Sequence, residues 1–166
     1  MKFYPTDKVQ RLTVTALLTA LTAVSTMIIK LPIPATGGYI HPGDGLVLLS
    51  GFLLGPVYGT FAAGAGSALA DLLSGYLVFA PATLVIKGAT AFVASQLHKK
   101  LLQGILTKER LSLTIAGAAG EICMVLGYFL FESALYGPAA SAAGVPFNIL
   151  QGVFGVIIAL VLFPLL

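Results

Sequence analysis

The sequence is poor in charge and nearly free of cysteine. Only 9% of its 166 residues are charged, whereas 58% are hydrophobic, and the mean hydropathy is +1.00. Soluble domains carry about 25% charged residues, so this chain has too few to cover a surface in contact with water. The single cysteine, Cys123, excludes an internal disulfide and a cysteine-based metal cluster. The composition indicates an integral membrane protein.

The sequence also lacks the residues that several kinds of active site require. No second histidine or cysteine stands at metal-ligand spacing, and there is no nucleophile paired with a base and no phosphate-binding glycine loop. We therefore expect no metal, no cofactor and no enzymatic activity. A membrane enzyme that uses Glu121 or Asp71 as acid or base is the competing interpretation, and it would require turnover of a lipid-like substrate.

Apolar runs and helix breakers predict an all-α, six-helix membrane bundle that forms one domain over residues 1–166. We expect helices at about 10–29, 44–55, 57–76, 81–98, 111–133 and 147–164. The apolar stretch from 46 to 76 is too long for one crossing, and Gly55-Pro56 interrupts it. Residues 136–148 contain two glycines and two prolines and are predicted to be a loop.

Basic residues favour the same count of helices. Three lie before or at the start of the first predicted helix and four lie between the fourth and the fifth. The positive-inside rule places both groups in the cytoplasm, which requires an even number of crossings between them. A break at Gly55-Pro56 satisfies this requirement, and both termini are then cytoplasmic.

Charged side chains within the predicted helices need partners, because each costs about 3 kcal/mol near the bilayer centre. Asp71 and Lys87 fall at comparable depths on consecutive helices, so an ion pair between them is expected. This pair either fixes the helix register or presents Lys87 to a substrate oxygen. Thr83 shares the face of Lys87, one turn nearer the outside.

A second polar stripe follows the fifth predicted helix. Glu121, Tyr128 and Glu132 share one face and run from mid-membrane to the outer rim. They resemble the wall of a cavity that opens outward. Alternatively, Glu132 is an interfacial charge, Tyr128 belongs to an aromatic belt, and Glu121 makes a structural hydrogen bond.

Amide side chains and the first loop complete the candidate site. Asn148 and Gln151 are three residues apart and face the same way, and amides suit neutral heteroaromatic ligands because they both donate and accept. A helix cap is the alternative role for Asn148. Tyr39 and His41 flank the approach to the predicted cavity from the first loop.

Small residues recur every four positions on the first helix, at Ala16 and Ala20 with Ala23 beyond. In lipid, such spacing lets helices approach closely. An external protein partner and packing inside the bundle are both open interpretations. On the third predicted helix, where Gly55, Gly59 and Ala63 follow the same spacing, internal packing is favoured.

The full chain resembles the substrate-binding (S) components of energy-coupling factor (ECF) vitamin transporters. The resemblance rests on Arg11-Leu12 before Ala16-xxx-Ala20, on the runs 39–44, 66–76 and 81–88, on Gly55-Pro56-xx-Gly59, on Glu121-xx-Met124-Val125-xx-Tyr128 and on Pro146-Phe147-Asn148-xx-Gln151. These segments resemble the riboflavin-type branch, which includes proteins assigned to pyridoxine and hydroxymethylpyrimidine.

The resemblance implies a six-helix bundle in the bacterial cytoplasmic membrane that binds a water-soluble vitamin in an outward-facing pocket. Partners would be a membrane scaffold (T) component and two cytoplasmic ATPases. Ala16, Ala20 and Ala23 would dock on the scaffold. The implied substrate-binding residues are Tyr39, His41, Thr83, Lys87, Glu121, Tyr128, Asn148 and Gln151.

The vitamin itself stays open at this stage. The polar set suits pyridoxine or hydroxymethylpyrimidine better than a bulky flavin, and the chain has no tryptophan to stack a ligand. A riboflavin-binding S component and a solo carrier coupled to protons through Glu121 are the alternatives.

Overall fold

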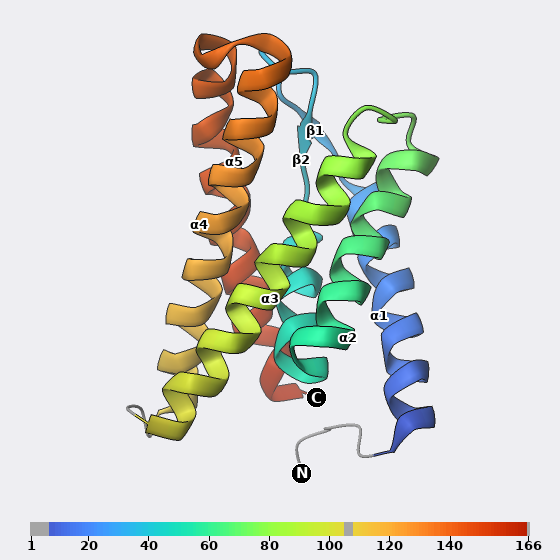
Figure 1. The fold of residues 1–166 in the computed structure, drawn as a ribbon, viewed down its shortest axis with the longest axis vertical. Coiled ribbons are helices and arrows are strands. Elements are labelled where there is room, and N and C mark those ends of the chain that lie inside the picture. Colours follow the sequence, from blue (N-terminus) through green and yellow to red (C-terminus); the bar gives the residue numbers. More distant parts are fainter. Residues whose placement is uncertain (1–6, 105–107, 166) are drawn as a thin grey trace.

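The computed structural model describes residues 7–104 and 108–165, which form five helices and one short β-hairpin (Figure 1). The helices are α1 (Lys8–Ile28), α2 (Asp44–Leu73), α3 (Ala80–Gly104), α4 (Glu109–Tyr136) and α5 (Pro138–Leu162), the last continued by the 3-10 turn η1 (Phe163–Leu165). The hairpin lies between α1 and α2, where β1 (Leu31–Pro32) pairs antiparallel with β2 (Tyr39–Ile40).

The six-helix bundle predicted from the sequence is wrong. The described residues form five helices, and four of them are long and apolar enough to cross a membrane: α1, α2, α4 and α5 extended to Leu165. The segments predicted as separate second and third helices form the single element α2, with Pro56 inside it. Only Gly55 leaves helical geometry, at φ 77° and ψ −175°, a conformation that is essentially restricted to glycine.

The chain reverses its direction within α2 at Gly55. A Cβ atom built on Gly59 would lie 2.5 Å from the carbonyl oxygen of Ser50, although nine residues of a straight helix span about 13 Å. Because of this reversal, α1 begins and α3 ends at the same end of the molecule (Figure 1). The basic residues of α1 and α3 therefore share one end, which the positive-inside rule assigns to the cytoplasm, without a sixth helix.

The segment predicted as a loop at 136–148 is helical from Pro138 onward. Gly137 alone joins α4 to α5, at φ 87°, and Pro146 lies inside α5. Proline at the first helical position loses no hydrogen bond, and membrane helices tolerate an internal proline. Asn148 therefore lies within a helix, and its alternative role as a helix cap is wrong.

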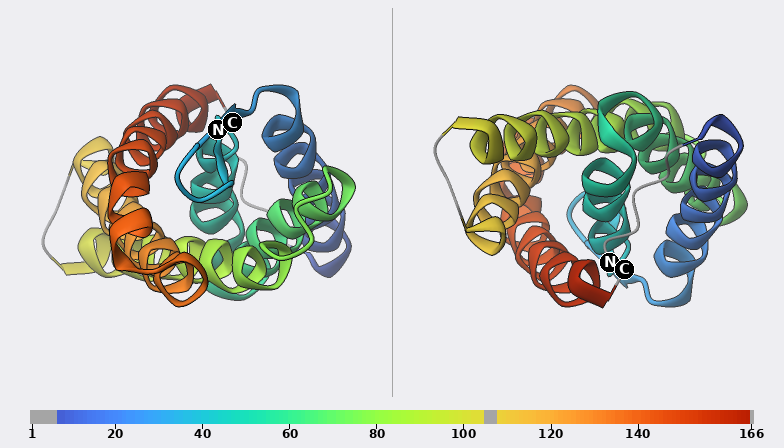
Figure 2. Two further views of the ribbon diagram at one scale, coloured as in Figure 1. Left: turned by 90° about the horizontal axis from the view of Figure 1, so that it is seen from above. Right: turned by 90° about the horizontal axis from the view of Figure 1, so that it is seen from below.

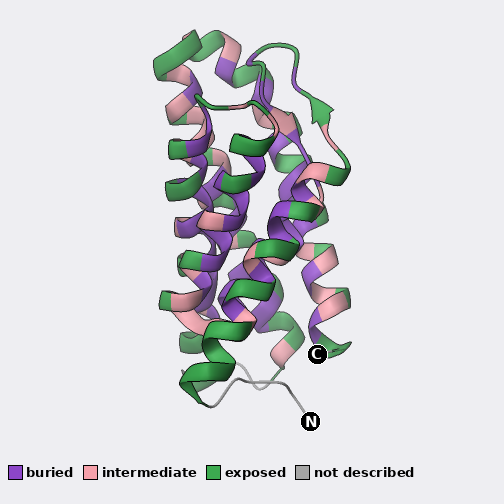
Figure 3. Cartoon of the chain, turned by 90° about the vertical axis from the view of Figure 1, so that its right-hand side faces the viewer, coloured by how far each residue is buried: buried purple, intermediate pink, exposed green. Residues whose placement is uncertain are grey.

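The first half of α2 runs through the middle of the molecule, and the other helices surround it (Figure 2). Every residue from Val47 to Leu53 is buried. Buried residues face this centre (Figure 3), while large apolar side chains such as Val57, Phe61 and Leu130 are exposed on the outside, where lipid is their solvent. Because the first half of α2 lies in the middle of this ring of helices, its start is next to α3, α4 and α5.

Candidate functional site

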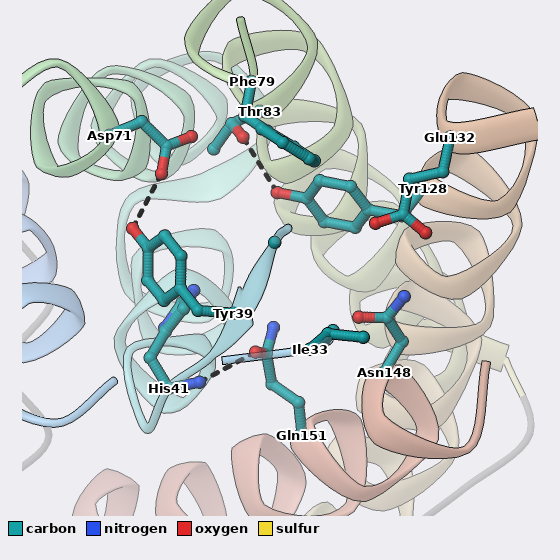
Figure 4. Close-up of a pocket in the computed structure, with 11 residues that line it drawn as sticks. Ile33, Tyr39, His41, Asp71, Phe79, Thr83, Tyr128, Glu132, Asn148 and Gln151 are labelled. Carbon is teal, nitrogen blue, oxygen red and sulfur yellow. Dashed lines mark hydrogen bonds between the residues drawn. The ribbon is translucent and has the colours of Figure 1, made fainter. Parts of the chain in front are cut away.

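A small polar cavity lies beside the β-hairpin (Figure 4), which Figure 1 shows toward the end of the molecule away from the start of α1. Its volume is about 20 Å³, which is room for roughly one water molecule. The lining comes from the first loop and from α2, α3, α4 and α5, and comprises Ile33, Gly38, Tyr39, His41, Asp71, Phe79, Thr83, Tyr128, Glu132, Asn148 and Gln151. A ligand of vitamin size does not fit in this volume, so residues around the cavity must shift to admit one.

Two hydrogen bonds tie the first loop to the helices around the cavity. The Tyr39 hydroxyl donates to Asp71 Oδ1 over 2.7 Å, and the backbone N–H of His41 donates to Gln151 Oε1 over 2.9 Å. Ile33 inserts from the same loop and is 2% exposed. The loop is therefore part of the site and covers it from outside.

The loop side chains are held in neutral forms. Burial lowers the pKa of His41 to about 3, and the charge of Asp44 opposes this effect only in part. The imidazole Nδ1 accepts a hydrogen bond from the backbone N–H of Gly43 at 3.1 Å. Burial and the hydrogen bond to Asp71 raise the pKa of Tyr39 well above its usual value, so its phenol stays a donor.

The opposite wall of the cavity comes from α3, from Phe79 just before it, and from α4. The hydroxyls of Thr83 and Tyr128 are 3.0 Å apart, and Phe79 packs edge-on against Phe131. Glu132 follows Tyr128 by one turn and is 2% exposed. Its interpretation as an interfacial charge is therefore wrong, because the side chain is buried beside Gly38 and Gly144.

Three buried polar atoms around the cavity have no hydrogen-bond partner within the described part of the chain. They are Asp71 Oδ2, Glu132 Oε2 and Asn148 Nδ2. A buried polar group left without a partner costs about 1–3 kcal/mol, so a fold rarely keeps three of them in one place without use. Figure 4 shows their side chains at separate points around the cavity that they line, which favours a site for a polar ligand.

An ion pair lies beneath the cavity, and it differs from the predicted one. The sequence paired Lys87 with Asp71, whereas the structure places Lys87 Nζ 2.5 Å from Asp44 Oδ1, with both side chains fully buried. Gln151 Nε2 donates to the other oxygen of Asp44 at 2.8 Å. Asp44 begins the central half of α2, so the reversal at Gly55 brings it next to Lys87, while Asp71 bonds to Tyr39.

Glu121 also lies outside the cavity. A Cβ on Gly155 would come within 3.0 Å of Glu121 Oε1 and 2.8 Å of the Asp44 Cβ. A Cβ on Gly152 would meet the Glu121 Cβ at 2.9 Å. Because neither glycine has a side chain, the Glu121 side chain can pass along the surface of α5 toward Asp44.

Six of the eight predicted substrate-binding residues therefore line one cavity: Tyr39, His41, Thr83, Tyr128, Asn148 and Gln151. The other two, Lys87 and Glu121, lie beneath it around Asp44. Sequence reasoning did not include Ile33, Gly38 or Phe79, which carry no polar signal. Glu132 could have been included among the predicted substrate-binding residues, because its spacing places it on the same helix face as Tyr128. No three potential metal ligands lie together among the residues described.

The predicted docking alanines do not share one face. Ala16 and Ala20 are exposed on the outside of α1. Ala23 is 7% exposed and packs inside the bundle, so its assignment to a docking surface is wrong. Gly66 of α2 approaches the other side of α1, where a Cβ would lie 2.6 Å from the carbonyl oxygen of Thr19.

The sequence is similar to those of known transport proteins. The family described as "ECF-type riboflavin transporter, S component" matches residues 6–166. The thiamine precursor transporter HmpT of Lactococcus lactis subsp. cremoris (strain MG1363) is 29% identical over 100% of this chain and 93% of its own length. An uncharacterized protein of Pyrococcus woesei is 42% identical over 81% of this chain and 86% of its own length.

Solved structures show the same fold. The S component of a bacterial ECF transporter superimposes with a TM-score of 0.72 at 25% identity, over 95% of both chains. The S component for biotin from an ECF-type ABC transporter gives a TM-score of 0.55 at 22% identity, again over 95% of both chains, and supports the fold alone.

Proposed function

From the premise that this chain belongs to the family of S components of ECF-type riboflavin transporters, we propose that its cavity binds a small ring-shaped vitamin precursor for import. Hydroxymethylpyrimidine is the first candidate and pyridoxine the second. An S component of a vitamin transporter is a membrane-embedded transport subunit, not an enzyme. The four apolar helices of this chain agree with that setting.

One observation carries the proposal: six of the eight residues predicted to bind substrate come from four separate segments and line a single cavity. The cavity combines aromatic rings, hydroxyls and amides, which are the groups that hold a small heterocycle by stacking and hydrogen bonding. The full-length similarity to a thiamine precursor transporter supports a precursor of that kind.

Energy for import is proposed to come from partners. The sequence contains no ATP-binding motif, and S components of this family work with a membrane T component and ATPases. We propose that this chain docks on the T component through the exposed face of α1 that carries Ala16 and Ala20. Close helix approach in lipid requires small residues, and both alanines are exposed.

Replacing Ala16 or Ala20 with Leu is expected to reduce vitamin uptake by at least about tenfold, because a loss of roughly 1.4 kcal/mol at a helix interface already has that effect. Ligand affinity should not change, since neither residue lines the cavity. Uptake in cells that express the complete transporter and calorimetric titration of the purified chain measure the two effects. Ala118→Leu, on the exposed face of α4, is the matched control and should leave uptake unchanged.

The ligand itself is best identified by mass spectrometry of the small molecule retained after gentle purification. Recovery of a pyrimidine or pyridine precursor is the expected result. Titration of riboflavin, pyridoxine and hydroxymethylpyrimidine against the purified chain then ranks the candidates. Uptake by proteoliposomes that contain only this chain, abolished by collapse of the proton gradient, would instead support a solo carrier.

A further inference from the structure

We propose that Asp71 and Glu132 select the ligand by its N–H groups, so that the substrate class is an amino-substituted nitrogen heterocycle without a phosphate. This inference rests on the proposed function and specifies the ligand of the same cavity. From the sequence, Asp71 was expected to pair with Lys87, and Glu132 was expected to form part of the cavity wall. The inference gives both carboxylates a role in binding.

Asp71 presents one oxygen to the cavity. Its Oδ1 accepts the hydrogen bond of Tyr39, whereas Oδ2 is buried and has no partner within the described residues. The side chain itself is 4% exposed. In Figure 4 it reaches the cavity from the side opposite Glu132.

Glu132 presents an oxygen in the same way. Its Oε2 is buried and unpartnered in the part of the chain that the structure describes. The backbone closes tightly around this carboxylate, since Cβ atoms on Gly38 and Gly144 would lie 3.4 Å and 3.2 Å from its oxygens. A side chain at either glycine would crowd the carboxylate, and because Glu132 lines the cavity, its free oxygen is available to a group that occupies the cavity.

No lysine or arginine is among the described residues that line the cavity, and Lys87 and Lys30 act on Asp71 only from outside it. The ammonium of Lys87 lies beneath it and is paired with Asp44. Lys30 lies over the rings of Tyr39 and Tyr76, 5.6 Å and 5.9 Å from their centroids. A phosphate group in the cavity would meet like charge in a site with little water, where repulsion is strong.

Asn148 adds a hydrogen-bond donor to the two carboxylate acceptors. It is one helical turn after Gly144, where a Cβ would lie 3.2 Å from Glu132 Oε2, and its Nδ2 is buried and without a partner in the described chain. An amide donor beside a carboxylate acceptor complements an amino group next to a ring nitrogen. Proteins use the same residue types, Asn or Gln and Glu or Asp, to read the amino edges of nucleic acid bases. An aminopyrimidine presents such an edge, whereas pyridoxine has no amino group.

Calorimetric titration of the purified full chain tests the inference. The probes are hydroxymethylpyrimidine, its phosphate ester and pyridoxine, and the proteins are wild type, Asp71→Asn and Glu132→Gln. We expect the phosphate ester to bind at least about a hundredfold more weakly than the free aminopyrimidine. Each variant should weaken binding of the aminopyrimidine by about ten- to a hundredfold, as expected for a hydrogen bond to a charged group. Glu109→Gln, at the cytoplasmic start of the same helix as Glu132, is the matched control and should bind as wild type does.

Two results would overturn the inference. One is equal affinity of wild type for the phosphate ester and the free compound, which needs no variant and so does not depend on folding of a mutant. The other is unchanged affinity for the aminopyrimidine in both variants. If none of the ring compounds nor riboflavin binds to wild type, the proposed function itself fails, which is a separate outcome.

Discussion

Replacing Lys87 with Met is expected to lower the free energy of unfolding by about 3–5 kcal/mol. The substitution keeps a long, unbranched side chain but leaves the Asp44 carboxylate buried without its cation. Asp44 is 0% exposed, so no solvent replaces the lost partner, and Gln151 supplies only one hydrogen bond. With about 2–4 °C per kcal/mol for a chain of this size, the midpoint should fall by roughly 10 °C.

Thermal unfolding of the purified protein in one detergent measures the effect, and two further variants show its origin. Lys99→Met removes an exposed cation near the cytoplasmic end of α3 and should shift the midpoint by less than about 2 °C, because exposed charges contribute little. Asp44→Asn combined with Lys87→Met should recover most of the loss, since a neutral amide no longer requires the cation. Equal losses in Lys87→Met and Lys99→Met would contradict the role of the pair.

Residues that share a helical face were predictable from the sequence. Tyr128 and Glu132 are one turn apart on α4, and Asn148 and Gln151 are three residues apart on α5, so their common direction follows from helical geometry alone. The structure brings both pairs to one cavity. The residue types also mattered, because polar side chains in membrane helices turn away from lipid.

The depth of a residue in the membrane was harder to predict than the helix face on which it lies. Glu121 belongs to the same stripe as Tyr128 and Glu132, but eleven residues of helix separate it from Glu132, which is about 16 Å. The cavity occupies only the outer part of that length. Glu121 therefore lies beneath it, next to Asp44.

The partner of Lys87 could not be derived from the sequence. Periodicity gives the face and approximate depth of each residue, but the lateral order of helices depends on where the chain turns. Here the reversal at Gly55 places the start of α2 in the middle of the ring (Figure 2). Asp44, at the start of the second predicted helix, thereby becomes the carboxylate that pairs with Lys87.

Prolines and glycines misled the prediction at α5. Residues 136–148 were predicted to be a loop because two of each occur there. Gly137 is the only one that breaks the helix. Gly144 instead serves close packing, against Glu132. Within a membrane, backbone groups have no water to bond with, and the helix continues through residues that would end it in a soluble protein.

Replacing Gly59 with Ala is expected to destabilise the protein by about 3 kcal/mol, the upper part of the usual range for overpacking. The new Cβ would lie 2.5 Å from the Ser50 carbonyl oxygen and 2.8 Å from the Gly51 Cα. Both are backbone atoms of the opposite half of α2, so no side chain can rotate away. The two halves must separate, and this displaces Asp44, which the first half of α2 carries to Lys87.

Gly88→Ala is the matched control for this prediction. Its Cβ would approach the Thr60 Cγ2 at 3.2 Å and the Thr60 carbonyl oxygen at 3.4 Å, which are looser contacts than the 2.5 Å at Gly59, and alanine gains about 0.5–1 kcal/mol over glycine within a helix. Thermal unfolding should therefore separate the two Gly→Ala changes by roughly 10 °C. Ligand titration adds a second measurement: Gly59→Ala should also weaken binding, because Asp44 holds Gln151 at the cavity floor. A Gly59→Ala protein as stable as the Gly88→Ala protein would mean that the two halves of α2 do not pack as tightly as this reversal requires.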